Sequence, residues 1–343
     1  MSKVSTATLK SYFKTGDTPT EANFINVFDT LKNLDDASWD VDITGVLDSS
    51  SKLQTIFNDA NDGDTIFLPR GIIYVNTSVS ITKKIKIVGQ GTIVKITSSI
   101  KAFSLDIDGV FIQNLWFKYF TGTKNSSQYG IFVNSKNDFK INNCSFEGLY
   151  HGIGFESTIL TGSFVPSEIT NCYFLSNTVG ISGGVRGEYV NINNCRGNLN
   201  TTHIEFQGGN INISSCILTA GVDGIKVMSG ANDSHGTISG SFINHLSGNC
   251  LLFSSITNGH IVDSCNFFGG TIFLQNCTGV SLQNCRIDVA NVLFENAVGS
   301  VFMSNRHSSG NTNTINKSYN GAPASTVVSS SNYNLNGTSY AGI

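Results

Sequence analysis

One four-residue pattern recurs nine times between residues 112 and 305, and it constrains the fold more than any other feature of the chain. Each copy has an apolar residue first, a small polar residue or glycine third, and most often a cysteine fourth. The copies are Ile112–Leu115, Ile141–Cys144, Ile169–Cys172, Ile192–Cys195, Ile213–Cys216, Ile238–Ser241, Val262–Cys265, Leu282–Cys285 and Phe302–Asn305, and they begin 20 to 29 residues apart. Repetition at this period is typical of solenoids, because each unit buries its apolar face only by stacking on the next. We therefore expect an all-β, single-stranded right-handed parallel β-helix.

Each coil of such a helix has its own internal order. The first and fourth residues of the pattern are expected to face inward. The third lies at a sharp bend that needs left-handed backbone angles, which Asn, Ser and Gly tolerate. Another inward residue follows two positions after the fourth, and a third short strand comes about nine residues after it, as at Ile204 and Phe206. Three strands in each coil predict a triangular prism, with stacked strands about 4.8 Å apart.

Composition excludes several classes of partner. Only 13% of the residues are charged, the formal net charge is −3, and Lys and Arg are scattered along the chain. Binding to nucleic acid or to an acidic membrane surface would call for clustered positive charge. No apolar run follows Met1 and none reaches transmembrane length, so we expect no signal peptide, no membrane insertion and no nucleic-acid partner.

Six of the eight cysteines occupy the fourth position of the pattern. Stacked neighbours then have parallel side chains, whereas a disulfide needs side chains that face each other. The close C-x-x-C pairs of many metal sites are absent. We expect a ladder of free, buried thiols in a protein made in a reducing compartment, with no metal and no other cofactor.

The repeat divides the chain into four parts. Residues 1–36 predict a helical anchor module, with a capping box at Thr18–Glu21 and an apolar helix face that must dock on the β-helix, on copies of the chain or on a larger assembly. Residues 37–100 predict the start of the β-helix and its N-terminal cap, a short helix with a capping box at Ser51–Gln54 that covers the open end. Residues 101–306 form the body, and residues 307–343 form a tail rich in Ser, Asn, Thr and Gly.

Two stretches resemble phage proteins. Leu9–Phe24 is similar to the N-terminal segment of tail-fibre-like proteins of phages and related contractile particles. The order of a helix, GDTIFLPRG (63–71), alternating strands and VGQG (88–91) resembles the start of phage tailspikes with a pectate-lyase-like β-helix. The resemblance implies a homotrimer on the tail of a virion or phage-like particle, made in the bacterial cytoplasm. Residues 1–36 would bind tail or baseplate proteins, and the β-helix would bind a bacterial surface polysaccharide or receptor.

Catalysis finds little support in the sequence. Glycosidases use two carboxyl groups on one face, but Glu205 is the one acidic residue among the outward positions of the third strand. The best cluster adds Asp223, Asp233 and His235 to Glu205, around Lys226. The carboxylate and arginine motifs of polygalacturonase-like enzymes and pectate lyases are not found where those families place them. Solvated surface charge explains the cluster better, so we assign no catalytic residue and keep these four as candidates.

A binding role needs less. Loops at 121–129, 157–168, 183–188 and 228–236 interrupt the coils and could present aromatic and polar groups to sugars. Outward apolar residues predict an oligomer interface: Ile217, Phe242, Leu252, Phe273 and Leu293. The sequence thus favours a tail-fibre or tailspike subunit that binds a surface glycan. Two alternatives stay open, a polysaccharide depolymerase (hydrolase or lyase) and a purely structural component of the particle.

Overall fold

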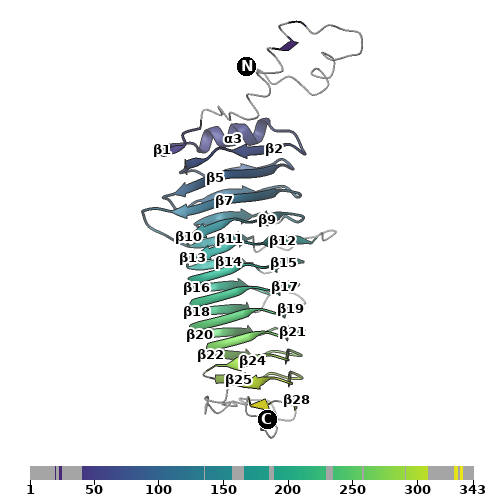
Figure 1. Ribbon diagram of the computed structural model, residues 1–343. Coiled ribbons are helices and arrows are strands. Elements are labelled where there is room, and N and C mark those ends of the chain that lie inside the picture. Colours follow the sequence, from purple (N-terminus) through teal and green to yellow (C-terminus); the bar gives the residue numbers. More distant parts are fainter. Residues whose placement is uncertain are drawn as a thin grey trace.

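The described chain is a right-handed parallel β-helix of about ten turns, stacked into a rod (Figure 1). The computed structural model describes residues 20, 23–24, 41–134, 136–156, 166–184, 189–228, 235–256, 259–289, 291–307, 328–330 and 333–334. The predicted fold class is confirmed. All but three residues of the predicted 1–36 module lie outside the described residues, so that module stays a prediction.

Every pairing between strands is parallel, and the strands form three ladders along the rod. Ladder 1 comprises β2 (Thr65–Leu68), the first part of β5 (Lys86–Ile96) and of β7 (Phe111–Tyr119), β9 (Lys140–Asn142), β12 (Ser167–Thr170), β15 (Val190–Asn193), β17 (Ile211–Ser214), β19 (Gly236–Ser239), β21 (His260–Asp263), β23 (Ser281–Gln283), β26 (Val301–Met303) and β28 (Val328–Ser330). This ladder carries the first residue of each sequence repeat.

Ladder 2 follows the bend of the repeat. It comprises β1 (Thr44–Asp48), β3 (Gly71–Val75), the second part of β5 and of β7, β10 (Ser145–Glu147), β13 (Tyr173–Leu175), the first part of β16 (Arg196–Phe206), β18 (Ile217–Met228), β20 (Phe242–Ser254) and β22 (Asn266–Gln275), then β24 (Arg286–Asp288), β27 (Arg306–His307) and β29 (Tyr333–Asn334).

Ladder 3 completes the prism. It comprises β4 (Val79–Ile81), β6 (Lys101–Leu105), β8 (Tyr129–Val133), β11 (His151–Phe155), β14 (Val179–Gly183), the second part of β16, β18, β20 and β22, and β25 (Asn291–Glu295). Strands β28 and β29 extend ladders 1 and 2 within the range read from sequence as a tail without a coil. Few apolar residues marked them in the sequence.

The bend between ladders 1 and 2 has the predicted left-handed backbone. The third residue of every repeat has a positive φ, from 50° at Asn143 to 59° at Asn114. Asparagine amides stack at this bend, because the Asn143 Nδ2 donates to the Asn114 Oδ1 at 2.8 Å and the Asn194 Nδ2 to the Asn171 Oδ1 at 2.7 Å. These bonds join neighbouring coils along one corner of the prism.

Apolar side chains dominate the core, and a few buried polar residues such as Asn200 and His203 interrupt it. All eight cysteines are free and buried, as the thiol-ladder prediction requires. Phenylalanine rings stack from coil to coil, with centroids 5.2 Å apart between Phe117 and Phe146 and 5.0 Å apart between Phe146 and Phe174. At the N-terminal end, Phe57 of the cap helix packs edge-to-face on Phe103, which packs in the same way on Phe117.

The cap helix α3 (Ser50–Asp59) differs in detail from the sequence prediction. It begins one residue before the expected capping box, and the Asp48 Oδ1 accepts the Ser50 N–H at 3.0 Å. The Gln54 side chain bonds instead to the backbone of Ser80 in β4, donating to the carbonyl at 2.9 Å and accepting the N–H at 2.8 Å. The capping-box prediction was therefore wrong, because Gln54 satisfies the open edge of ladder 3.

Candidate ligand-binding groove

The predicted charged cluster is partly assembled on the outer face of ladder 3. Glu205 pairs in register with Lys226, and the Lys226 Nζ lies 3.7 Å from the Glu205 Oε2 and 3.3 Å from the Asp223 Oδ2. The two carboxylate oxygens are therefore separated by at most the sum of these distances, 7.0 Å. The lysine bridges both carboxylates, and all three side chains keep some contact with solvent. This is the geometry of a charge-neutralising network.

Two further candidates were named from the sequence, Asp233 and His235. Asp233 lies outside the described residues. His235 is exposed immediately before β19. The pKa of His260 is lowered to about 4, mainly by burial and also by the charge of His235. Asp223 has a structural role as well, since its Oδ1 accepts the Asn249 N–H at 2.8 Å from the next coil.

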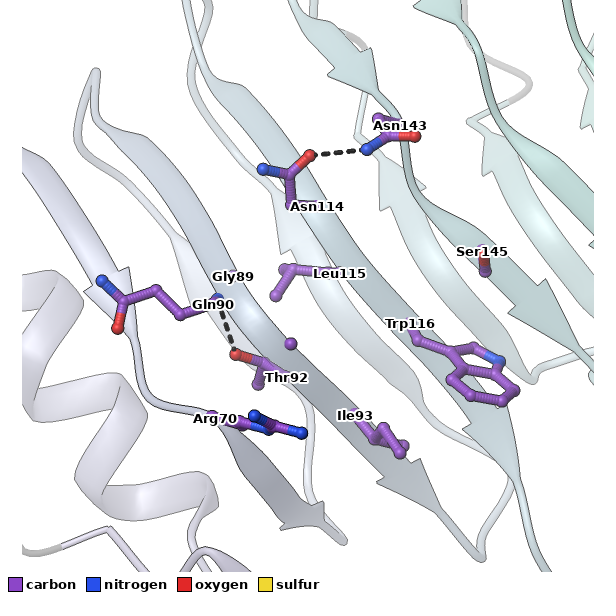
Figure 2. Close-up of a pocket in the computed structure, with 11 residues that line it drawn as sticks. Arg70, Gly89, Gln90, Thr92, Ile93, Asn114, Leu115, Trp116, Asn143 and Ser145 are labelled. Carbon is purple, nitrogen blue, oxygen red and sulfur yellow. Dashed lines mark hydrogen bonds between the residues drawn. The ribbon is translucent and has the colours of Figure 1, made fainter.

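A hollow of about 730 Å³ lies elsewhere, at the corner between ladders 1 and 2 near the N-terminal end of the rod (Figure 2). It spans neighbouring coils, from the turn before β3 to β10. Its lining residues are Arg70, Gly89, Gln90, Gly91, Thr92, Ile93, Asn114, Leu115, Trp116, Asn143 and Ser145. Figure 2 shows Arg70 toward one end, Trp116 toward the other, and the bonded Asn114–Asn143 pair along one edge.

Glycines and one buried hydroxyl shape this hollow. A β-carbon at Gly89 would lie 2.3 Å from the carbonyl oxygen of Asn114, so only glycine lets these two coils approach so closely. The buried Thr92 hydroxyl lies 2.9 Å from the carbonyl oxygen of Leu68 and 2.7 Å from that of Pro69. This contact ties β5 to the turn that carries Arg70, so the exposed arginine stands on a fixed backbone.

The side chains of the hollow offer stacking and hydrogen bonding together. Trp116 is 37% exposed. The Lys118 Nζ lies 4.8 Å from the centre of the Trp116 ring and 2.8 Å from the Glu147 Oε1. Among the described residues, the Asn114–Asn143 bond leaves the Asn114 Nδ2 and the Asn143 Oδ1 without a hydrogen-bond partner. An aromatic face beside free amide groups can hold a sugar ring, which has both apolar faces and hydroxyl groups.

A second hollow of about 470 Å³ repeats this composition further along the same corner. It is lined by Asn171, Cys172, Tyr173, Asn194 and Arg196. Tyr173 is 37% exposed and lies in the same outward column as Trp116, and Arg196 follows Tyr173 in register on the next coil. The two hollows adjoin, because Ser145 of the first pairs in register with Tyr173 of the second. We call the two together the corner groove.

Sequence reasoning missed this groove. The asparagines were assigned only to the backbone bend, and glycan binding was placed in the four loops. Of these loops the structure describes 121–129 in full and only parts of the other three. A signal was present in the sequence, since the residue two places after each bend asparagine is outward-facing. In the two hollows these residues are Trp116, Ser145, Tyr173 and Arg196.

Other kinds of site find no support in the part of the chain that the structure describes. Its His, Cys, Asp and Glu side chains form no group of three or more that could hold a metal ion. None of the described helices has the length and apolar character needed to cross a membrane.

Comparison with known proteins places the fold. No protein-family model and no curated protein match the chain. Among solved structures, ORF18 of Geobacillus virus E2 matches with a TM-score of 0.56 and 13% identity, over 86% of this chain and 66% of its own. The A-module of the Azotobacter vinelandii mannuronan C-5 epimerase AlgE4 matches with a TM-score of 0.56 and 15% identity, over 87% of this chain and 94% of its own.

A mutant tailspike protein of E. coli bacteriophage HK620, in complex with a pentasaccharide, has a TM-score of 0.55 and 11% identity, over 86% of this chain and 64% of its own. The chain thus spans about two thirds of the length of these two phage proteins. At such identities the similarity is one of architecture. The chain shares its parallel β-helix with a phage tailspike, with a second phage protein and with a mannuronan C-5 epimerase.

Proposed function

We propose that the protein is a tail-fibre or tailspike subunit of a phage or phage-like particle and that it binds a bacterial surface polysaccharide. The observation that carries the proposal is the corner groove, in which Trp116 and Tyr173 lie beside stacked asparagine amides. The β-helix shared with phage tailspikes supports it, and one of those tailspikes was solved with a pentasaccharide. The particle tail as location and residues 1–36 as the link to tail or baseplate proteins belong to the same proposal.

The groove suits a polymer better than a single sugar. Trp116 and Tyr173 are two coils apart, which places them about 10 Å apart along the rod. A polysaccharide that lies parallel to the rod axis would therefore meet both aromatic side chains in succession. Sugars between them would face Ser145, whose small side chain leaves room for a ring.

Assembly into a trimer is also part of the proposal. The outward apolar residues named from the sequence occupy two faces of the prism. Ile217 and Phe242 lie on ladder 2 and are 40% and 49% exposed, whereas Leu252, Phe273 and Leu293 lie in register on ladder 3 and are half-buried. Two different apolar faces suit a closed ring, because each interface of a ring joins unlike surfaces of neighbouring subunits.

Binding to purified capsular polysaccharides and lipopolysaccharides tests the function. We expect at least one of them to bind the wild-type protein, and Trp116→Ala to weaken that binding about fivefold, because stacking on an aromatic side chain is worth about 1 kcal/mol. Phe67→Ala is the matched control, since Phe67 is 40% exposed near the same end of the rod and lines neither hollow. Equal loss with both variants, or no binding to any glycan, would contradict the proposal.

A depolymerase is the second candidate, favoured by the placement of Glu205 and Asp223 on either side of Lys226. Their separation of at most 7.0 Å overlaps the range of about 5–9.5 Å for the carboxyl pairs of glycosidases. The bridging lysine argues against it, because it occupies the space between the two carboxylates in which a glycosidic bond would have to lie.

A further inference from the structure

We infer that the corner groove selects anionic polysaccharides, with Arg70 and Arg196 as the contacts for the negative charge. The inference rests on the proposed function and goes beyond it, because it names the chemical class of the glycan. Each hollow contains one arginine, and no carboxylate is among the residues that line either of them. A neutral glycan would leave these two charges unused.

The two arginines differ from the lysines of the rod that form ion pairs. Lys118, Lys140 and Lys226 each contact a carboxylate of a neighbouring coil. Arg70 and Arg196 are exposed, and neither forms an ion pair with a described residue. Their guanidinium groups are therefore open to an external anion, and the planar guanidinium suits bidentate contact with a carboxylate or a phosphate.

The spacing of these charges indicates an extended ligand. The turn with Arg70 and the strand with Arg196 are separated by five coil steps, or about 24 Å along the rod. Trp116 and Tyr173 lie between them on the same corner. A polysaccharide along the groove would thus meet, in order, a cation, two aromatic platforms and a second cation. Short oligosaccharides would reach only one of the arginines.

The test compares acidic polysaccharides with their neutral counterparts. Alginate, polygalacturonate, hyaluronan and colominic acid are offered to the full chain, each beside the same polymer after reduction of its carboxyl groups to alcohols. Polyribitol phosphate serves as the phosphate arm and dextran as the neutral one. We expect an acidic polymer to bind and its reduced form to bind at least about tenfold more weakly, since a hydrogen bond to a charged group is worth about 1.5–3 kcal/mol.

Variants assign the charge to the groove. Arg70→Gln and Arg196→Gln should each weaken the acidic polymer about fivefold or more and leave the affinity for its reduced form unchanged. Arg286→Gln is the matched control, because Arg286 lies in the same outward column of ladder 2 as Arg196 but lines neither hollow. Its guanidinium carbon lies 5.0 Å from the ring centre of Phe268. It should bind like the wild type.

The outcomes separate this inference from the proposed function. Binding of polyribitol phosphate without the carboxylate polymers would support an anionic ligand and identify phosphate as its source. Equal affinity of the wild type for an acidic polymer and for its carboxyl-reduced form would overturn the inference while glycan binding stands. An equal loss of affinity for the acidic polymer in Arg286→Gln and Arg196→Gln would do the same. Failure of all charged and neutral glycans, including the capsular and lipopolysaccharide set, would overturn the proposed function itself.

Discussion

The imidazole of His203 fills the space that a side chain at Gly197 would occupy, because a β-carbon there would lie 2.3 Å from the His203 Nδ1. Gly197 continues the inward column of Phe146 and Phe174. The stack of rings therefore stops at Phe174, and a histidine from the other end of β16 enters the core in its place. The Asn200 side chain holds it, with its Nδ2 2.9 Å from the His203 Nδ1, while the His203 Nε2 donates to the Ala220 carbonyl at 3.0 Å.

Gly197→Ala should therefore destabilise the fold by about 1–3 kcal/mol, the usual cost of inserting a methyl group into a filled core. Chemical denaturation measures the loss of unfolding free energy. His203→Ala provides the control background, because it empties the space that the new methyl group needs. In that background Gly197→Ala should cost much less. An equal cost in both backgrounds would show that the two side chains do not compete for space.

Acid should weaken the fold through the same histidine. Burial lowers the pKa of His203 to about 4 from an ordinary value of 6.5, against a smaller opposing effect of the Ala220 carbonyl. Between these values the unfolded chain binds a proton that the folded chain does not. Stability is thus fully present above pH 6.5 and falls as the pH drops toward 4, by about 2–3 kcal/mol for this group.

Urea denaturation of the wild type and of His203→Gln at pH 7.5 and pH 4.5 checks this effect. The variant should lose less stability than the wild type between the two pH values. Some loss should remain, because burial also lowers the pKa of His151 to about 4. Parallel losses in the two proteins would exclude His203 as a source of acid sensitivity.

The buried thiols make a third prediction. Burial raises the pKa of Cys144 and of Cys277 to about 12, so almost no reactive thiolate exists at neutral pH. A thiol reagent should therefore label most cysteines only after denaturation. Cys195→Asp should prevent folding, since it buries an unpaired charge, while Cys195→Ala should cost about 1–2 kcal/mol. Rapid labelling of several thiols in the native protein would contradict the buried ladder.

Much of the fold follows from the sequence because the repeat encodes it. Each repeat needs an inward apolar residue, a residue that tolerates the left-handed bend and, in most copies, a buried thiol. Ile192, Asn194 and Cys195 meet these local requirements in one coil. In the coil of Gly197 the His203 ring fills the space that a phenylalanine ring fills in the preceding coils, and this could not be predicted in this way. It depends on two residues of one coil that meet across the core, and the sequence shows only a gap in the column.

The groove was harder to predict for a related reason. Asn114 and Asn143 have two roles, as bend residues and as the amide edge of a hollow, and the first role explains their presence completely. The hollow exists because Gly89 allows close approach of two coils and Arg70 projects from a turn of a third. Such convergence of side chains from neighbouring coils needs the register between strands. Sequence reasoning placed Glu205 beside Lys226 because the register of that one ladder was readable from the repeat.

The last prediction concerns catalysis by that pair. We expect the wild-type protein to release neither new reducing ends nor unsaturated sugars from any polysaccharide that it binds. Lys226 contacts both Glu205 and Asp223, so the lysine occupies the space between the two carboxylates in which a glycosidic bond would have to lie.

Glu205→Gln, Asp223→Asn, Asp233→Asn and His235→Ala should accordingly leave polysaccharide binding unchanged. Asparagine is chosen at 223 because it keeps an acceptor for the Asn249 N–H, which alanine would leave unpaired at a cost of about 1–3 kcal/mol. If the wild type cleaves a bound polysaccharide, and one of these variants stops the cleavage while it keeps the fold and the affinity, then ladder 3 holds a depolymerase site. In that case the corner groove would bind the polysaccharide that the site on ladder 3 cleaves.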